Sequence, residues 1–190
     1  MLEVTTKPVP TLGPRMLAVG WLATGALLAV GGAMRHVPQV GPVFLLASLA
    51  MWITVYRRGG ATRQWLDSFP LRPLLALHIL RLPIGVLFLY EASQGRLSDV
   101  FANRAGIGDI VIGVLAIGAV AASRSRAIVR AFSVFGLADI FLALGTGMYL
   151  RFVVHEPHMI AAFEHRGYAL LPLALVPTVI LAHLLVLARR

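Results

Sequence analysis

Long apolar stretches alternate with short polar segments along most of the chain. Six of these stretches have between 17 and 22 residues, and a helix of about 17–25 apolar residues crosses a hydrocarbon core of about 30 Å. The pattern therefore predicts an all-α integral membrane bundle of six transmembrane helices, in which short connections make consecutive helices antiparallel neighbours. The predicted spans are residues 16–34, 40–56, 73–93, 105–122, 131–150 and 167–188.

The distribution of basic residues predicts the orientation of this bundle. We expect residues 1–15 to form a cytoplasmic tail and residues 16–190 to form a single transmembrane domain. With the N-terminus inside, eleven of the 17 lysine and arginine residues fall on the inner side and five on the outer side. This excess follows the positive-inside rule, so both termini are expected to be cytoplasmic.

The composition supports a membrane protein and excludes several other classes. Hydrophobic residues make up 58% of the chain and charged residues 13%, against about 45–50% and about 25% in globular proteins. We attribute the net charge of +9 to membrane orientation, and we expect no nucleic-acid partner. The absence of cysteine excludes disulfides, thiolate zinc sites and a cysteine nucleophile. Nothing in the sequence specifically supports an enzyme.

Two oppositely charged residues are predicted to meet inside the membrane. Arg81 and Asp139 each lie eight residues from the inner end of a predicted span, which corresponds to a depth of about 12 Å. Charged groups at such a depth usually pair or line a cavity. The pair is therefore interpreted either as a buried ion pair that fixes helix register or as a proton or anion site in a permeation path.

A second polar layer is predicted near the outer surface, where Glu91 ends the third span and Asp109 begins the fourth. Residues 106–114 and 136–144 also share a pattern in which a small residue follows the aspartate by four positions. Small residues at this spacing allow helices to approach closely, so both aspartates are expected to point into the bundle. We expect Asp109 near the outside and Asp139 near the inside.

Two groups of histidines raise the question of a cofactor or metal. His78 and His183 lie at a similar predicted depth on different spans, as bis-histidine ligation of haem b would require. The loop before the last span is expected to be solvated, with a short helix that begins at Pro157. The alternative is that this loop binds a divalent metal ion. The residues of that metal hypothesis are His155, His158, Glu164 and His165.

Three segments resemble a group of uncharacterised bacterial six-span inner-membrane proteins. They are RAGIGDIVIGVLA (104–116), FGLADIFLALGTG (135–147) and LPLALVPTVILAHLLVL (171–187), and the resemblance covers about residues 75–188. It implies a multi-pass protein of the bacterial cytoplasmic (inner) membrane with six helices, and it brings no activity and no catalytic residues.

The leading hypothesis is a transport or permeation protein for a proton-coupled or anionic small solute. Arg81 and Asp139 would form the site within the membrane, while Asp109 and Glu91 would attract ions at the outer mouth. No cofactor is predicted under this hypothesis. The alternatives are a haem b redox protein using His78 and His183, or a non-catalytic subunit of a larger membrane complex. Since six helices make a thin bundle, a homo-oligomer or a partner membrane subunit is expected in the lipid bilayer.

Overall fold

The computed structural model describes residues 12–164 and 166–189, and within them every regular element is helical. Six helices in this part of the chain are long and apolar enough to cross a membrane, which confirms the predicted fold class. They span Leu12–Val30, Val40–Arg58, Leu71–Ser93, Asp99–Ala121, Arg126–Phe152 and Gly167–Ala188.

Three of the spans are single α-helices for their whole length, and three contain a short non-α turn. The uninterrupted helices are α1 (Leu12–Val30), α3 (Val40–Arg58) and α9 (Arg126–Phe152). The third span joins α5 (Leu71–Ala76), a 3₁₀ turn η1 (Leu77–Leu80) and α6 (Arg81–Ser93). The fourth joins α7 (Asp99–Phe101), a π turn η2 (Ala102–Gly106) and α8 (Ile107–Ala121). The sixth joins α11 (Arg166–Leu170), a π turn η3 (Leu171–Leu175) and α12 (Val176–Ala188).

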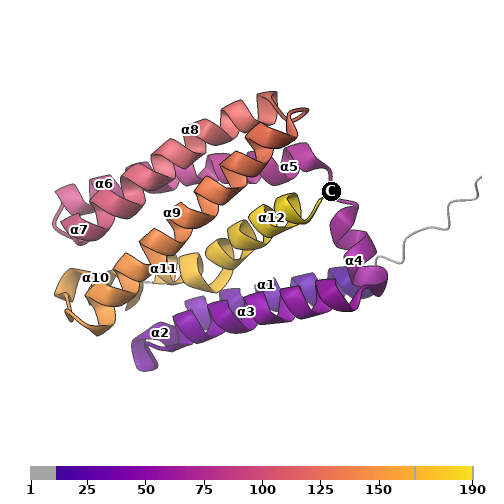
Figure 1. The fold of residues 1–190 in the computed structure, drawn as a ribbon. Coiled ribbons are helices and arrows are strands. Elements are labelled where there is room, and N and C mark those ends of the chain that lie inside the picture. The colour runs from indigo at the N-terminus through magenta and orange to yellow at the C-terminus, as the bar shows by residue number, and fades with distance from the viewer. Residues whose placement is uncertain (1–11, 165, 190) are drawn as a thin grey trace, which may run out of the picture.

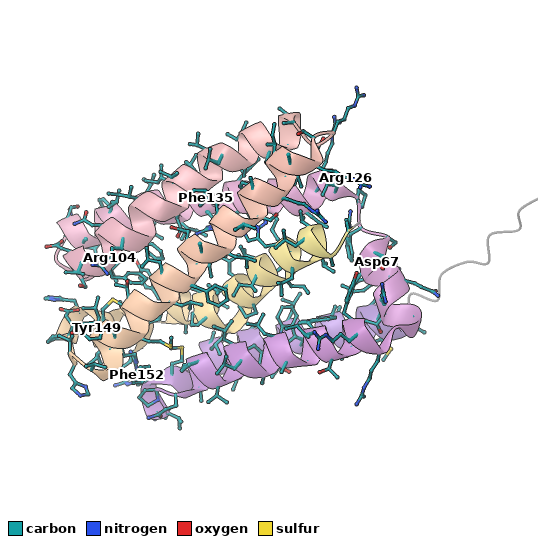
Figure 2. All side chains as sticks on the ribbon, viewed as in Figure 1. Asp67, Arg104, Arg126, Phe135, Tyr149 and Phe152 are labelled. Atoms are coloured by element: carbon teal, nitrogen blue, oxygen red, sulfur yellow. The ribbon has the colours of Figure 1, made fainter. Side chains whose placement is uncertain are left out.

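Figure 1 shows the helices running between two ends of an elongated bundle. One end, called the terminal end below, carries α4 (Gly60–Asp67) and the C-terminus. The opposite, distal end carries α2 (Ala33–His36), α7 and α10 (Pro157–Glu164). α1 and α3 lie along one side of the bundle, and α9 crosses it obliquely beside α12. The outer surface is apolar, and Figure 2 shows side chains such as Phe135 on it.

Several boundaries differ from those that hydropathy predicts. Residues 12–15 belong to α1 rather than to the tail, because Pro14 occupies the first turn, where proline removes no helical hydrogen bond. Residues 1–11 of the predicted tail lie outside the described residues. The fourth span begins at Asp99 instead of residue 105, since the polar residues near its start are included in the helix. The helix predicted from Pro157 is confirmed as α10.

Proline accounts for the irregular turn beside Arg81. Pro83 has no backbone N–H, and its ring excludes the carbonyl of the residue four positions earlier. The chain responds with the 3₁₀ turn η1 directly before α6. This turn contains His78 and ends at the residue before Arg81, so it sets the direction of both side chains.

Close glycine contacts hold α6 against α8, the most extensively packed pair of helices. A Cβ atom added to Gly85 would overlap the carbonyl of Gly106 and lie 2.9 Å from the backbone nitrogen of Ile110. A Cβ added to Gly113 would lie 2.7 Å from the backbone nitrogen of Leu82. These backbone atoms cannot rotate away, so the two helices can lie this close only because both positions are glycine and have no side chain.

We expect Gly85→Ala to separate α6 from α8 and to lower the free energy of unfolding by about 1–3 kcal/mol, the usual cost of overpacking. Unfolding in mixed detergent micelles, followed by circular dichroism, measures this change. Gly118→Ala is the matched control on α8, because nothing lies within 4 Å of a Cβ there. Equal stability of the two variants would contradict the close-packing argument.

Candidate functional site

A single arginine binds two aspartates from different helices in the interior of the bundle. The Arg81 Nε donates to the Asp109 Oδ1 at 2.6 Å, and its Nη2 donates to the Asp139 Oδ2. The Nη1 donates to the carbonyl of Gly136 at 3.5 Å. Only 5% of the Arg81 side chain is exposed, with 14% for Asp109 and 16% for Asp139. These three side chains, from α6, α8 and α9, are called the ion cluster.

The ion cluster lies near the middle of its three spans. Arg81 is ten residues from the start of its span at Leu71, and Asp109 is ten residues from the start of its span at Asp99. Because these spans run in opposite directions, both residues lie about 15 Å from opposite ends of a core of about 30 Å. Asp139 is the central residue of Arg126–Phe152.

The pairing of Arg81 with Asp139 is confirmed, but the placement of Asp109 near the outer surface with Glu91 is wrong. Asp109 lies deeper because its span begins six residues earlier than hydropathy predicts. Both aspartates therefore meet Arg81 at one level instead of lying near opposite surfaces. Glu91 instead lies near the distal end, where its two carboxylate oxygens accept hydrogen bonds from Arg96 at 2.6 and 2.8 Å.

Two glycines of the shared pattern make room for the side chains of this region. A Cβ on Gly108 would overlap the carboxylate of Asp139, so hydrogen at this position admits that carboxylate beside α8. A Cβ on Gly136 would overlap the ring of His183. The backbone of Gly136 thus contacts an imidazole and also accepts a hydrogen bond from Arg81.

His78 and His183 lie against each other beside the ion cluster, fully buried. Their ring centroids are 3.8 Å apart with an interplanar angle of 20°, and Phe132 packs its edge against His78. Among the described residues, none of the four ring nitrogens has a hydrogen-bond partner. The similar depth predicted for the two residues is consistent with this contact.

This stacking does not fit the haem b hypothesis. Bis-histidine ligation places the two rings on opposite faces of a porphyrin, with a nitrogen of each directed at the iron. Here the two rings contact each other face to face, and the backbone of Gly136 packs against His183. The two residues in this arrangement leave no space for a porphyrin between them.

A largely apolar chamber of about 130 Å³ extends from the ion cluster towards the distal end. Arg81 and Asp109 line it at the membrane centre, and Arg151 lines it near the distal end. Between them the wall is apolar, with contributions from α3, α6, α9 and the sixth span. Representative wall residues are Leu45, Ile84, Phe88, Ile140, Leu144 and Leu175.

Arg151, one of the five basic residues that the predicted topology places on the outer side, is buried in the structure. It is 6% exposed, and it donates hydrogen bonds to the carbonyls of Ile160 at 3.1 Å, Met34 at 3.3 Å and Met159 at 3.5 Å. Its Nε has no hydrogen-bond partner in the part of the chain that the structure describes. The signal in the sequence is the run YLRFVV, in which Arg151 has apolar neighbours on both sides.

The loop before the last span is organised by a carboxylate. Glu156 accepts hydrogen bonds from the backbone N–H of Met159 at 2.7 Å and of His158 at 3.2 Å, and the His158 Nδ1 lies 2.8 Å from its Oε1. Burial alone would raise the pKa of Glu156, but these hydrogen bonds hold the pKa below its usual value. Glu156 thereby caps the first turn of α10.

The described residues of this loop do not come together as a metal site. No group of three histidine, cysteine or acidic residues that could hold a metal ion occurs in residues 12–164 and 166–189. His155 is exposed, and His158 is engaged by Glu156. His165, the remaining histidine of the metal hypothesis, lies outside the described residues.

Residues 37–189 match the family model described as a domain of unknown function (DUF8737). The chain belongs to this family. The matched range includes the ion cluster, the stacked histidines and Arg151, so all the polar features described above lie within the family domain. Comparisons with curated proteins and with solved structures each find no match.

Removing only the arginine of the ion cluster should be far more harmful than removing all its charges. We expect Arg81→Gln to lower the free energy of unfolding by about 3–5 kcal/mol, because two buried carboxylates lose their counter-ion. The triple variant Arg81→Gln/Asp109→Asn/Asp139→Asn should recover most of this loss. Unfolding in mixed micelles measures both values.

Arg63→Gln is the control for charge removal at an exposed pair, because the side chains of Arg63 and Asp67 are both largely exposed, and it should leave stability nearly unchanged. If the triple variant were no more stable than Arg81→Gln, the loss would come from packing of the arginine side chain and not from unpaired charge.

Acid should loosen α10 through Glu156. Because folding lowers the pKa of this group, its contribution to stability is present above the ordinary value of 4.5 and is lost as pH falls through the lowered pKa. Hydrogen–deuterium exchange of residues 157–164, corrected for intrinsic rates, should therefore accelerate in acid. Glu156→Gln should show the faster exchange already at neutral pH, and a wild-type response in that variant would contradict the capping role.

Proposed function

We propose that the protein is a proton-coupled transport protein for a small solute, in which the ion cluster carries the proton and the chamber receives the solute. The observation that supports this proposal most directly is the composition of the ion cluster. One guanidinium faces two carboxylates, so the three groups have a formal charge of −1 near the centre of a membrane protein. Bound protons or cations neutralise such a charge.

A structural ion pair would not need the second aspartate. A 1:1 pair already neutralises Arg81, and adding Asp109 leaves a net charge in a region of low dielectric, which is costly unless it is compensated. Uptake of one proton by the two carboxylates removes this cost. Because Arg81 is occupied by both aspartates, we assign it to organising the proton site and not to binding an anionic solute.

Buried histidines on one side of the ion cluster and a cavity on the other support a path for protons. The stacked histidines lie on the terminal side, since His78 precedes Arg81 in a span that starts at the terminal end. Each neutral imidazole offers one N–H donor and one nitrogen acceptor to a hydrogen-bonded chain. On the distal side the chamber reaches Asp109 directly. The bundle thus contains hydrogen-bonding groups on one side of its centre and a cavity on the other.

The arginine distribution supports the expected orientation, with the terminal end in the cytoplasm and the chamber towards the outside. On this orientation the solute enters from the outer side, and we place the protein in a bacterial inner membrane. The sequence predicts that Glu91 attracts ions at the outer mouth. Because Arg96 neutralises the charge of Glu91, we propose that this contribution is small.

Infrared spectroscopy tests the proton site without knowledge of the solute. At neutral pH the purified protein should show the C=O stretching band of a buried, protonated carboxylic acid. The band should disappear in the triple variant, where no carboxylate remains in the ion cluster. Asp67→Asn is the control, because Asp67 lies exposed on α4 at the terminal end (Figure 2).

Proteoliposomes then test transport. With a pH-sensitive dye inside and an imposed potassium diffusion potential, the wild-type protein should admit protons in the presence of its solute, and the stable triple variant should not. A wild-type protein without the carboxylic acid band would overturn the proton site. Proton entry that is unchanged in the triple variant would overturn the assignment of transport to the ion cluster.

A further inference from the structure

The geometry points to a binding site for a small carboxylate with an apolar body, with the carboxylate on Arg151 and the hydrocarbon in the chamber. Arg151 lies near the distal end of this cavity, 12 residues from Asp139 along α9, which is about 18 Å. The anion site is therefore separate from the ion cluster. The inference names the solute class of the proposed transporter and in that respect rests on the proposed function.

The bonding of Arg151 leaves it able to bind an anion. Its three hydrogen bonds go to backbone carbonyls, which satisfy N–H groups but do not cancel the positive charge. Within the described residues it forms no ion pair. Glu164 acts on it electrostatically from beyond ion-pair distance and does not line the chamber. A buried guanidinium without a direct carboxylate partner favours an anionic ligand.

The unpartnered Nε gives the site a specific donor. Among the residues that the structure describes, this buried atom has no acceptor, and the arginine to which it belongs is 94% buried and lines the cavity. A buried donor without an acceptor is costly, and a ligand oxygen would satisfy it. The carbonyls of α2 and α10 hold the rest of the guanidinium in place, so the donor is already oriented before a ligand arrives.

The chamber limits the size and polarity of the rest of the ligand. Its volume of about 130 Å³ is slightly smaller than that of an apolar cavity that accepts benzene, about 150 Å³. Its walls between the two charged ends come from aliphatic and aromatic side chains such as Ile84, Phe88 and Leu144. A hydrocarbon group of about the size of a phenyl ring matches this space. A second charge on the ligand would lie against an apolar wall, so monoanions are favoured over dianions.

Equilibrium dialysis with radiolabelled benzoate tests the site in the chain of 190 residues. The protein is reconstituted in nanodiscs of phosphatidylcholine, whose zwitterionic head groups add no net charge, at neutral pH. We expect saturable binding of one benzoate per chain. Benzamide has the same ring without the charge. Its affinity as a competitor should be lower by at least about tenfold, because a charge-assisted hydrogen bond is lost.

Variants separate binding from structural effects. Arg151→Gln should weaken benzoate binding about tenfold or more, and Arg151→Lys should retain part of it because the charge remains. Arg96→Gln removes an exposed arginine from the same end of the bundle and should bind like the wild type. Ala143→Leu keeps Arg151 but fills part of the chamber, so it should also lose binding even if the arginine variants fold poorly.

Competition by a series of carboxylates identifies the source of the ligand. Affinity that peaks near hexanoate or benzoate indicates a soluble monocarboxylate that enters from water. Affinity that continues to rise to palmitate indicates a fatty acid that enters from the bilayer. Either result supports the carboxylate site, provided that it depends on Arg151.

Absence of saturable benzoate binding, or equal binding in the wild type, Arg151→Gln and Ala143→Leu, would overturn the inference. The result is independent of the proton measurements. If the protein binds benzoate but its ion cluster is not protonated, the carboxylate site is supported and the proposed proton coupling is contradicted. If the ion cluster is protonated but benzoate does not bind, proton coupling is supported and the carboxylate site is contradicted.

Discussion

The guanidinium of Arg81, shared by two carboxylates, is the interaction on which the rest of the bundle depends. An arginine in the hydrocarbon region is costly unless it is paired, so the helices that carry its partners must approach α6 closely. Glycine provides close approach at three positions: Gly85 and Gly113 between α6 and α8, and Gly108 beside the Asp139 carboxylate. The small-residue pattern of the fourth and fifth spans is therefore the steric counterpart of the ion cluster.

Hydropathy predicts the spans well because the bilayer imposes one length and one polarity on every crossing segment. The same reasoning brought Arg81 to Asp139 from depth alone. It failed for Asp109 because the polar residues Asp99, Asn103 and Arg104 mask the first turns of the fourth span. An error of six residues displaces a side chain by about 9 Å along the helix axis. Depth predictions are thus only as good as the helix boundary from which they are counted.

Contacts between side chains of different helices were harder to predict from the sequence. Equal depth of His78 and His183 is compatible with a bound porphyrin and also with direct stacking, and only the rotation of the helices distinguishes the two. Arg151 lies near the end of its span, where arginine normally reaches water, and its burial results from coverage by α2 and α10. Hydropathy along one helix contains no information about that coverage.

The ion cluster also determines the order in which the protein can be assembled. Its members are separated by 28 and 58 residues, so the third span leaves the ribosome well before either partner of Arg81. Insertion of an unpaired arginine costs about 2.5–3.5 kcal/mol, which the apolar residues of Leu71–Ser93 must offset during synthesis. An 18-residue window of this span has a mean hydropathy of 1.8. The charge is first balanced when Asp109 arrives, and the cluster closes only after the fifth span has been made. A nascent chain that ends before Asp109 therefore differs from the finished protein by an unneutralised charge in the middle of the membrane.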